Sequence, residues 1–83
     1  MKALYFAWLR ERVGLTEETI EPPASVTTVG DLIGWLTARG ANYAYAFEKP
    51  DVVRTALDKR HARKDAKIAG VAEIAFFPPM TGG

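Results

Sequence analysis

The residues best suited to chemistry stand at the end of the sequence, in the segment 76–83, Phe-Phe-Pro-Pro-Met-Thr-Gly-Gly. Proline cannot donate a backbone hydrogen bond, so a β-ladder that runs into Pro78 and Pro79 must end at Phe77. Paired prolines also favour the extended polyproline conformation. Residues 78–83 can therefore reach up to about 20 Å from the sheet, at about 3.3 Å per residue. The pattern predicts a firm strand end followed by a slim arm.

The tip of this arm is the α-carboxylate of Gly83, which is ionised at neutral pH. Gly82 and Gly83 have no Cβ, so they fit a narrow channel and accept almost any backbone angle. A pair of terminal glycines can also be nothing more than a frayed end. The succession of strand, diproline and glycine pair favours a function instead, namely an arm that presents its carboxylate to the active site of another protein.

The composition excludes most chemistry within the chain itself. There is no cysteine, which rules out disulfides, thiolate zinc sites, cysteine nucleophiles and a persulfide carried on this chain. His61 is the only histidine, which argues against a histidine metal site or a Ser-His triad. No glycine-rich phosphate loop occurs. We therefore expect no metal, no permanently bound cofactor and no catalytic machinery of its own.

The length and charge set the class of protein. The 83 residues suffice for one domain, and 48% hydrophobic with 25% charged residues are typical of a globular chain. No apolar run approaches the roughly 20 residues of a membrane span, and the N-terminus lacks the pattern of a signal peptide. A net charge of +1 argues against a nucleic-acid protein. We expect a cytoplasmic protein with neither a membrane nor a nucleic acid as partner.

The first strand is predicted over residues 3–8, which are apolar at both parities, so both of its faces could be covered. A helical turn over 9–13 should stop at Gly14. A second strand over 16–21 is expected to form a hairpin with the first and to end at the proline pair 22–23.

The main helix is predicted to start after Thr28, a good N-cap, with Asp31 in its first turn and Gly40 at its end. Asn42 should cap a short second helix over 43–47. The apolar residues of the main helix follow the spacing of one helical face, which predicts that they are buried against the sheet. They are Val29, Leu32, Ile33 and Leu36.

The C-terminal half contains a third strand over 52–57 and a final strand over 73–77, whose Ile74 and Phe76 should face the core. Residues 67–68 are expected to pair briefly. The polar segment 58–65, which follows the third predicted strand, carries four Lys or Arg residues around the histidine. It has no interleaved aromatic side chains, which favours a solvated hairpin tip over a nucleic-acid patch.

These elements predict an α+β roll, in which a mixed sheet packs on one main helix. The domain should comprise residues 1–77, and the arm residues 78–83.

The ending Glu-Ile-Ala-Phe-Phe-Pro-Pro-Met-Thr-Gly-Gly, residues 73–83, resembles that of the family of molybdopterin synthase small subunits. The opening residues 4–7 with Arg10-Glu11 behind them, and the helix start at residues 28–29, are also similar to that family. The length and the element order agree over essentially the whole chain. The tail is the specific part of the resemblance, whereas the middle matches mainly in pattern.

The resemblance implies a ubiquitin-like β-grasp fold and a sulfur carrier that is a non-catalytic subunit of the synthase. Gly83 would be adenylated by a ubiquitin-activating-type enzyme that uses ATP, and then converted to a thiocarboxylate with sulfur from a cysteine desulfurase or rhodanese-type donor. The large subunit would receive the tail, and the sulfur would pass to cyclic pyranopterin monophosphate in a heterotetramer. The inserted residues would be Pro78, Pro79, Met80, Thr81 and Gly82.

In such a fold the first and last strands are neighbours, so Phe6 and Phe77 are expected to share an outer apolar patch at the root of the arm. We assign these two residues, with His61, to the partner interface. The alternative is that both phenylalanine rings pack in the domain's own core.

Two departures from the family leave the choice of activating enzyme and large subunit open. Residues 69–72, Ala-Gly-Val-Ala, replace the acidic Asp-Gly-Asp turn, and Leu57-Asp58 replaces Val-Asn before an unusually basic stretch. Three other functions stay open as well. They are a sulfur carrier for thiamine or another pathway, a ubiquitin-like modifier joined to a target lysine, and an interaction domain with an inert tail.

Overall fold

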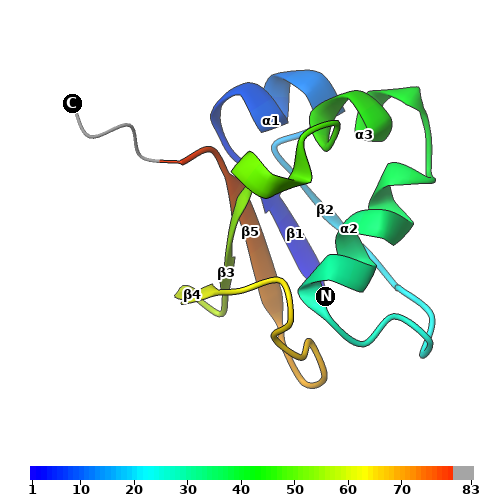
Figure 1. Cartoon of the computed structure of the whole chain (residues 1–83), viewed down its shortest axis with the longest axis vertical. Helices are drawn as coiled ribbons and strands as arrows, with labels where there is room; N and C mark the ends of the chain where they lie inside the picture. Colours follow the sequence, from blue (N-terminus) through cyan, green and yellow to red (C-terminus); the bar gives the residue numbers. More distant parts are fainter. Residues whose placement is uncertain (80–83) are drawn as a thin grey trace.

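The computed structural model describes residues 1–79, which form one five-stranded mixed sheet with helices on one face and at one end (Figure 1). The elements in chain order are β1 (Lys2–Tyr5), α1 (Ala7–Val13), β2 (Glu17–Thr19), α2 (Val29–Thr37), α3 (Ala41–Ala46), the 3-10 helix η1 (Pro50–Val52), β3 (Arg54–Leu57), β4 (Arg60–Ala62) and β5 (Glu73–Phe77).

The strand order is β2-β1-β5-β3-β4, so the last strand of the chain lies at the centre of the sheet. β5 runs parallel to β1, with Ala3 opposite Ile74, and antiparallel to β3, with Ala56 opposite Ala75. The two edge strands are also antiparallel to their neighbours: β2 pairs with β1, and β4 pairs with β3. The predicted α+β roll with a mixed sheet is therefore confirmed.

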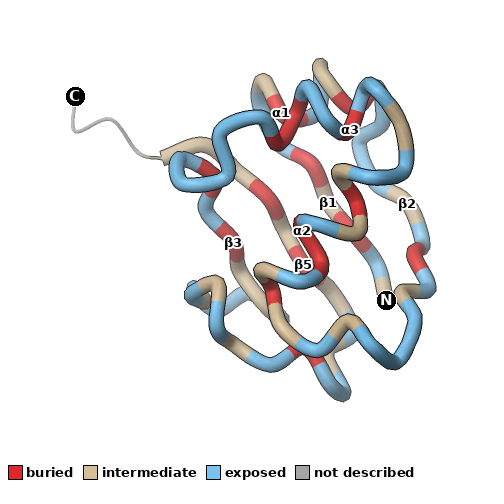
Figure 2. Tube along the Cα trace, turned by 45° about the vertical axis from the view of Figure 1, so that its right-hand side comes forward, coloured by how far each residue is buried: buried red, intermediate tan, exposed pale blue. Residues whose placement is uncertain are grey.

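The main helix α2 crosses one face of this sheet (Figure 2). A capping box holds its first turn, because the Thr28 hydroxyl accepts from the backbone N–H of Asp31 while the Asp31 carboxylate accepts from that of Thr28. Its apolar stripe is buried as predicted, in one core with Ile74 and Phe76 of β5. The helix ends at Thr37, three residues before the expected Gly40.

The first strand is shorter than predicted. β1 ends at Tyr5, the backbone turns through Ala7 at a φ of 53°, and Trp8 belongs to α1. An apolar run does not show where a strand gives way to a helix, and here the helix places Leu9 in the core at full burial. The stop at Gly14 is confirmed, with a φ of 90° that favours glycine.

The polar segment 58–65 contains a strand that was not predicted. Asp58 and Lys59 form a two-residue turn with φ values of 48° and 71°, and β4 follows directly. The Asp58 carboxylate accepts from the backbone N–H groups of Ala72 and Glu73 at 3.2 and 3.0 Å. Residues 67–68 make no strand, and only a bridge joins Lys67 to Thr28.

Two further expectations were wrong in detail. Residues 50–52 form the 3-10 helix η1, so the third strand starts at Arg54. Asn42 lies inside α3, and its side-chain amide donates to the carbonyl of Val13 at 2.8 Å instead of capping its own helix. The amide thereby joins α3 to the end of α1.

Candidate functional site at the root of the arm

The central strand β5 carries the chain into the arm. It ends at Phe77 as predicted, immediately before Pro78 and Pro79, which are half-buried. Hydrogen bonding continues to the very end of the strand, where the backbone N–H of Phe6 donates to the carbonyl of Phe76 at 3.1 Å. The predicted arm residues 80–83, Met-Thr-Gly-Gly, lie outside the described residues.

An aromatic cluster fixes this strand end from the inside. The Phe76 side chain is fully buried. Its ring stacks on Tyr5 with centroids 5.8 Å apart, and it makes a T-shaped contact with the Phe47 ring with centroids 5.1 Å apart. Three large rings, one from β1, one from β5 and one from the residue that follows α3, therefore pack together at the end of β5. The arm thus starts from a rigid point.

The outer face of the same strand end brings together the three predicted interface residues. The His61 ring meets the Phe77 ring edge-on, with centroids 5.4 Å apart and planes at 89°. Phe6 follows directly after the register pair Tyr5–Phe76 on the neighbouring strand, and its side chain is 47% exposed. Neither Phe6 nor Phe77 belongs to the core, so the alternative that both rings pack inside is wrong.

The register adds residues that the sequence did not reveal. Leu4 and Ala56 both pair with Ala75, and Arg54 pairs with Phe77, so all four share the outer face. The first three are half-buried and Arg54 is exposed. A two-residue alternation carries this information, but only once the strand pairing is known. Together with Phe6, Phe77 and His61 they form what we call the outer patch.

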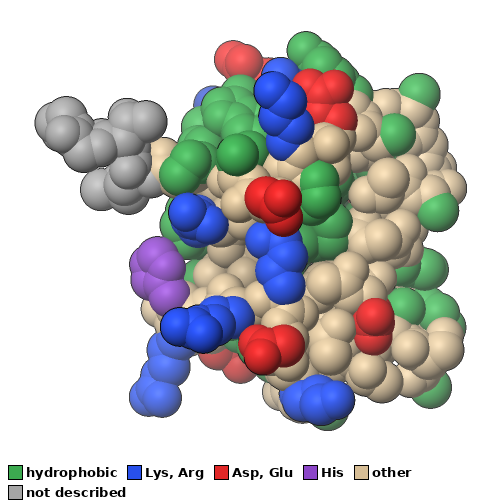
Figure 3. Space-filling model, in the orientation of Figure 1, with side chains coloured by type: hydrophobic (Ala, Val, Ile, Leu, Met, Phe, Trp, Pro, Cys, Tyr) green, Lys and Arg blue, Asp and Glu red, His purple; other side chains and the backbone are tan. Residues whose placement is uncertain are grey.

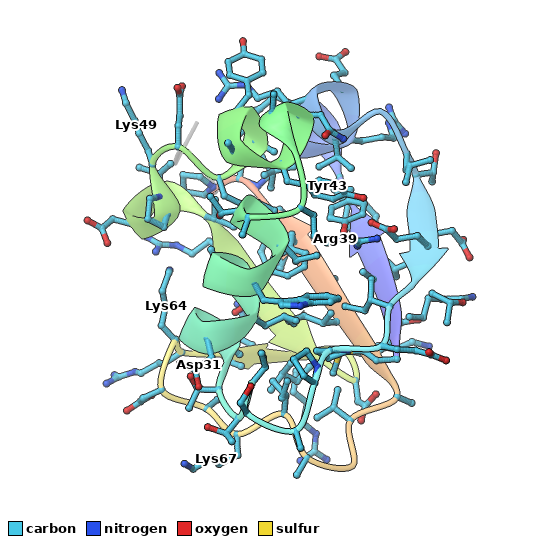
Figure 4. The ribbon with its side chains drawn as sticks, turned by 90° about the vertical axis from the view of Figure 1, so that its right-hand side faces the viewer. Asp31, Arg39, Tyr43, Lys49, Lys64 and Lys67 are labelled. Carbon is cyan, nitrogen blue, oxygen red and sulfur yellow. The ribbon has the colours of Figure 1, made fainter. Side chains whose placement is uncertain are left out.

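Two tyrosines with raised pKa values lie away from the outer patch, around Glu18 of β2. The Glu18 carboxylate accepts from the hydroxyls of Tyr5 at 2.8 Å and Tyr43 at 2.7 Å, and from Arg39 at 3.3 Å. Burial, and then the hydrogen bond to Glu18, raise the pKa of both tyrosines. Figure 4 shows Arg39 beside Tyr43 near β2. This cluster joins the helical side of the molecule to the edge strand β2, so its role is to stabilise the fold.

A metal centre and a membrane span are two further possibilities for residues 1–79. No group of three His, Cys, Asp or Glu side chains in this part of the chain is placed to hold a metal ion. No helix in the same range is long and apolar enough to cross a membrane.

The sequence of residues 3–83 matches the model of the ThiS family. The chain belongs to the ThiS family. It is 36% identical, over all of its length and 99% of the relative's, to the molybdopterin synthase sulfur carrier subunit of Escherichia coli K12. The resemblance to the small-subunit family that the tail indicated is therefore confirmed.

Solved structures agree with this placement. The crystal structure of SAMP1 from Haloferax volcanii superposes with a TM-score of 0.73 at 25% identity, covering 100% of this chain and 98% of that one. The putative molybdopterin converting factor, subunit 1, from Pyrococcus furiosus gives a TM-score of 0.71 at 28% identity and 94% coverage of both chains. This ThiS-family chain has the β-grasp fold that the resemblance implied.

Proposed function

We propose that this chain is the sulfur carrier subunit of a molybdopterin synthase. The observation that carries the proposal is the route of β5, the central strand of a ThiS-family fold, directly into Pro78 and Pro79 ahead of a terminal glycine pair. The relationship to the Escherichia coli subunit over the full length of the chain supports it. In this role the chain is a co-substrate in the cytoplasm, and the catalytic groups belong to its partners.

The first step activates the terminal carboxylate of Gly83. A carboxylate is a poor acceptor for a sulfur nucleophile, because the leaving group would be an oxide. An oxygen of the carboxylate attacks the α-phosphate of ATP in a ubiquitin-activating-type adenylyltransferase, and pyrophosphate leaves. The product is a mixed anhydride with AMP as a good leaving group. ATP is thus used by the activating enzyme and is not a cofactor of this chain.

A donor of the cysteine desulfurase or rhodanese type supplies the sulfur as a persulfide, whose terminal sulfur displaces AMP at the carbonyl carbon and forms an acyl disulfide. A second thiol then cleaves the S–S bond, which leaves a thiocarboxylate on Gly83 and a disulfide on the donor. A chain without cysteine has no side-chain thiol to carry sulfur, so the terminal carbonyl carbon is the natural place. The arm, residues 78–83, enters the large subunit of the synthase and gives its sulfur to cyclic pyranopterin monophosphate. Two such transfers build the dithiolene, in a heterotetramer with two carriers.

The described residues support this role through the root of the arm. The buried rings of Tyr5, Phe47 and Phe76 fix the strand end. The exposed ring of Phe6 and the outer side of Phe77 offer an apolar surface to whichever enzyme receives the arm. A rigid root and an anchoring surface hold the start of the arm beside a partner's active site, which raises the effective concentration of the terminal carbonyl there.

Intact mass spectrometry tests the proposal. Wild type is incubated with a cognate activating enzyme, ATP and a sulfur donor, and it should gain the mass of one oxygen exchanged for sulfur in its C-terminal peptide. A chain lacking Gly83 is the matched control. Its terminus stops about 3.3 Å short, and a displacement of 1 Å can cost about a hundredfold in rate. Equal molybdopterin synthesis by both chains would refute the proposal.

The same reaction separates the other functions. A modifier would give adducts of high molecular weight through an amide bond to lysine. A carrier for thiamine would form the thiocarboxylate but would not support molybdopterin synthesis with the large subunit. An inert tail would give no change in mass with any cognate activating enzyme.

A further inference from the structure

A basic pocket opens at the edge of the sheet, beside the root of the arm. It has a volume of about 430 Å³ and lies between β3 and the end of β4. The side chains that line it include four that carry or can carry positive charge. We call this site the basic pocket; it is lined by Val53, Arg54, His61, Ala62, Arg63 and Lys64.

The cations of this pocket have no carboxylate partner among residues 1–79. The ion pairs in that part of the chain join Lys2 to Glu17, Arg12 to Glu48 and Arg39 to Glu18, all elsewhere. The Lys64 ammonium donates to the carbonyl of Val53 at 3.2 Å, and Arg54 donates to that of Asp51 at 3.5 Å. Both acceptors are neutral, so the charge of the pocket is not compensated locally.

The charge of the whole chain is segregated in the same way. Residues 54–67 hold six Lys or Arg and two Asp, a net charge of +4, and the remaining residues hold five and eight, a net charge of −3. The sum is the +1 of the chain. Figure 3 shows the histidine and neighbouring basic side chains gathered on the side of the molecule from which the arm leaves. Such a patch attracts an anionic surface and speeds its association.

The pocket is continuous with the outer patch. Arg54 is the register partner of Phe77, and the His61 ring contacts that of Phe77. A protein that binds over Phe6 and Phe77 therefore also lies next to the basic pocket.

The reach of the arm and the composition of the basic segment indicate what kind of anion fits the basic pocket. Gly83 can lie up to about 20 Å from the root of the arm, so a phosphate that reacts at Gly83 need not reach a pocket at the root. The basic segment has no interleaved aromatic side chains on which bases of a nucleic acid would stack. Carboxylates on a protein surface meet neither difficulty.

We propose that the basic pocket binds an acidic segment on the protein that receives the arm. The identity of that protein as the synthase large subunit rests on the proposed function, whereas the chemistry of the segment rests on the pocket. Docking at this second point fixes the rotation of the partner about the Phe6–Phe77 contact and gives the complex a marked dependence on salt.

A peptide titration tests the pocket without any assumption about function. Hexaglutamate is added to the isotopically labelled full chain, and the amide resonances of residues 54 and 61–64 should shift most. The double variant Arg54→Glu/Arg63→Glu should lose these shifts. Lys67→Glu is the control for a single charge reversal, because Lys67 belongs to the same basic segment but does not line the pocket. In Figure 4, Lys67 lies away from Lys64, toward the far end of the molecule.

Calorimetry with the synthase large subunit is the second measurement. The double variant should raise the Kd at least about tenfold at low salt and flatten its dependence on salt, whereas Lys67→Glu should stay within about twofold. Both pocket arginines are exposed, so thermal melting should show an intact fold. The neutral pair Arg54→Gln/Arg63→Gln should give an intermediate Kd.

The inference is overturned if hexaglutamate shifts all basic residues alike, or if the double variant binds the large subunit as wild type does. It is also overturned if inorganic phosphate or a deoxyadenosine dodecamer displaces the peptide at lower concentration than the peptide binds. If wild type forms no thiocarboxylate and does not bind the large subunit, the proposed function fails, and the peptide titration still decides the pocket.

Discussion

The two faces of β5 carry similar side chains in opposite circumstances. On the inner face, Ile74 and Phe76 are fully buried, and Phe76 is held between two further rings. On the outer face, Ala75 and Phe77 are half-buried, and the ring of Phe77 makes a T-shaped contact with the ring of His61. One strand thus builds the core with one side and leaves an apolar surface with the other, directly at the start of the arm.

The polar groups differ between the two sides as well. On the helical side, Glu18 accepts from two tyrosines and one arginine, and no buried side-chain polar atom within residues 1–79 lacks a partner. On the arm side, no carboxylate among residues 1–79 forms an ion pair with the basic pocket. Matched polar groups stabilise a fold, while unmatched exposed charge contributes little to it and is available to a partner. The comparison predicts that changes on the first side alter stability and changes on the second alter binding.

The largest effect is expected for Phe76→Ala. Removing a fully buried phenylalanine that packs against two rings typically costs about 3–5 kcal/mol, a large part of the stability of a small domain. Urea denaturation should show a much lower midpoint. A stability close to that of wild type would contradict the burial of Phe76 and the division of β5 into two faces.

Phe77→Ala, one residue along, should have the opposite profile. Its ring lies outside the core, so we expect a loss of about 1 kcal/mol in urea denaturation. As an anchor on the outer patch it should weaken binding of the synthase large subunit at least about tenfold by calorimetry. Unchanged affinity together with a large loss of stability would place Phe77 with the core.

The sequence was sufficient for the elements with strong local signals. The bounds of β5 and its end before Pro78 follow from alternation and from the missing proline N–H. The start of α2 follows from Thr28 and Asp31, and the end of α1 from Gly14. In each case the cause lies within a few residues of its effect.

Features that depend on contacts between residues far apart in the sequence could not be predicted from local patterns. β4 is an edge strand, and its polar residues give no apolar pattern to detect. The apolar pattern predicts Trp8 in a strand, but the backbone turns at Ala7, and the helix that follows places Leu9 in the core. Of the candidate site, the end of β5 before Pro78 has a local cause and was predicted, whereas the basic pocket depends on the pairing of β3 with β4.

Glu18→Gln tests the matched side. The substitution keeps the shape of the side chain but removes the negative charge of the carboxylate. The hydroxyls of Tyr5 and Tyr43 and the guanidinium of Arg39 donate to that carboxylate, and the single carbonyl oxygen of an amide accepts from three donors less well. We expect a loss of about 1–3 kcal/mol in the free energy of unfolding. Binding of the large subunit should not change, since Glu18 is on the edge strand β2, away from the outer patch. A loss of binding at full stability would contradict this.

Thr28→Ala should cost about 1 kcal/mol, because the N–H of Asp31 loses its acceptor at the start of α2. Thr28→Ser keeps the hydroxyl and is the control. The pKa of Asp31 is lowered, mainly by the backbone and side-chain hydrogen bonds from Thr27. Its contribution is therefore present above the unfolded pKa and is lost as the pH falls through the folded one, so acid should narrow the difference between Asp31→Asn and wild type.

The smallest effect concerns alkaline pH and Tyr5. Burial and Glu18 raise the pKa of Tyr5 above its ordinary value, so the folded chain keeps this proton while the unfolded chain loses it above about pH 10. The stability that this provides is fully present below the unfolded pKa and falls as the pH rises beyond it. At pH 10.5, a tyrosine that titrates only in the unfolded chain lowers the free energy of unfolding by about 0.8 kcal/mol.

Melting curves of wild type and Tyr5→Phe between pH 8 and pH 10.5 measure this decline. The variant is less stable at pH 8, because Glu18 loses a donor, but its stability should fall less steeply with pH. Tyr45→Phe is the control, since Tyr45 is exposed and makes no hydrogen bond to Glu18, and it should follow the wild-type slope. Equal slopes for Tyr5→Phe and wild type would mean that the Tyr5 hydroxyl titrates alike in both states. The Glu18 cluster would then be as open to water as the outer patch, and the contrast between the two sides of the sheet would be lost.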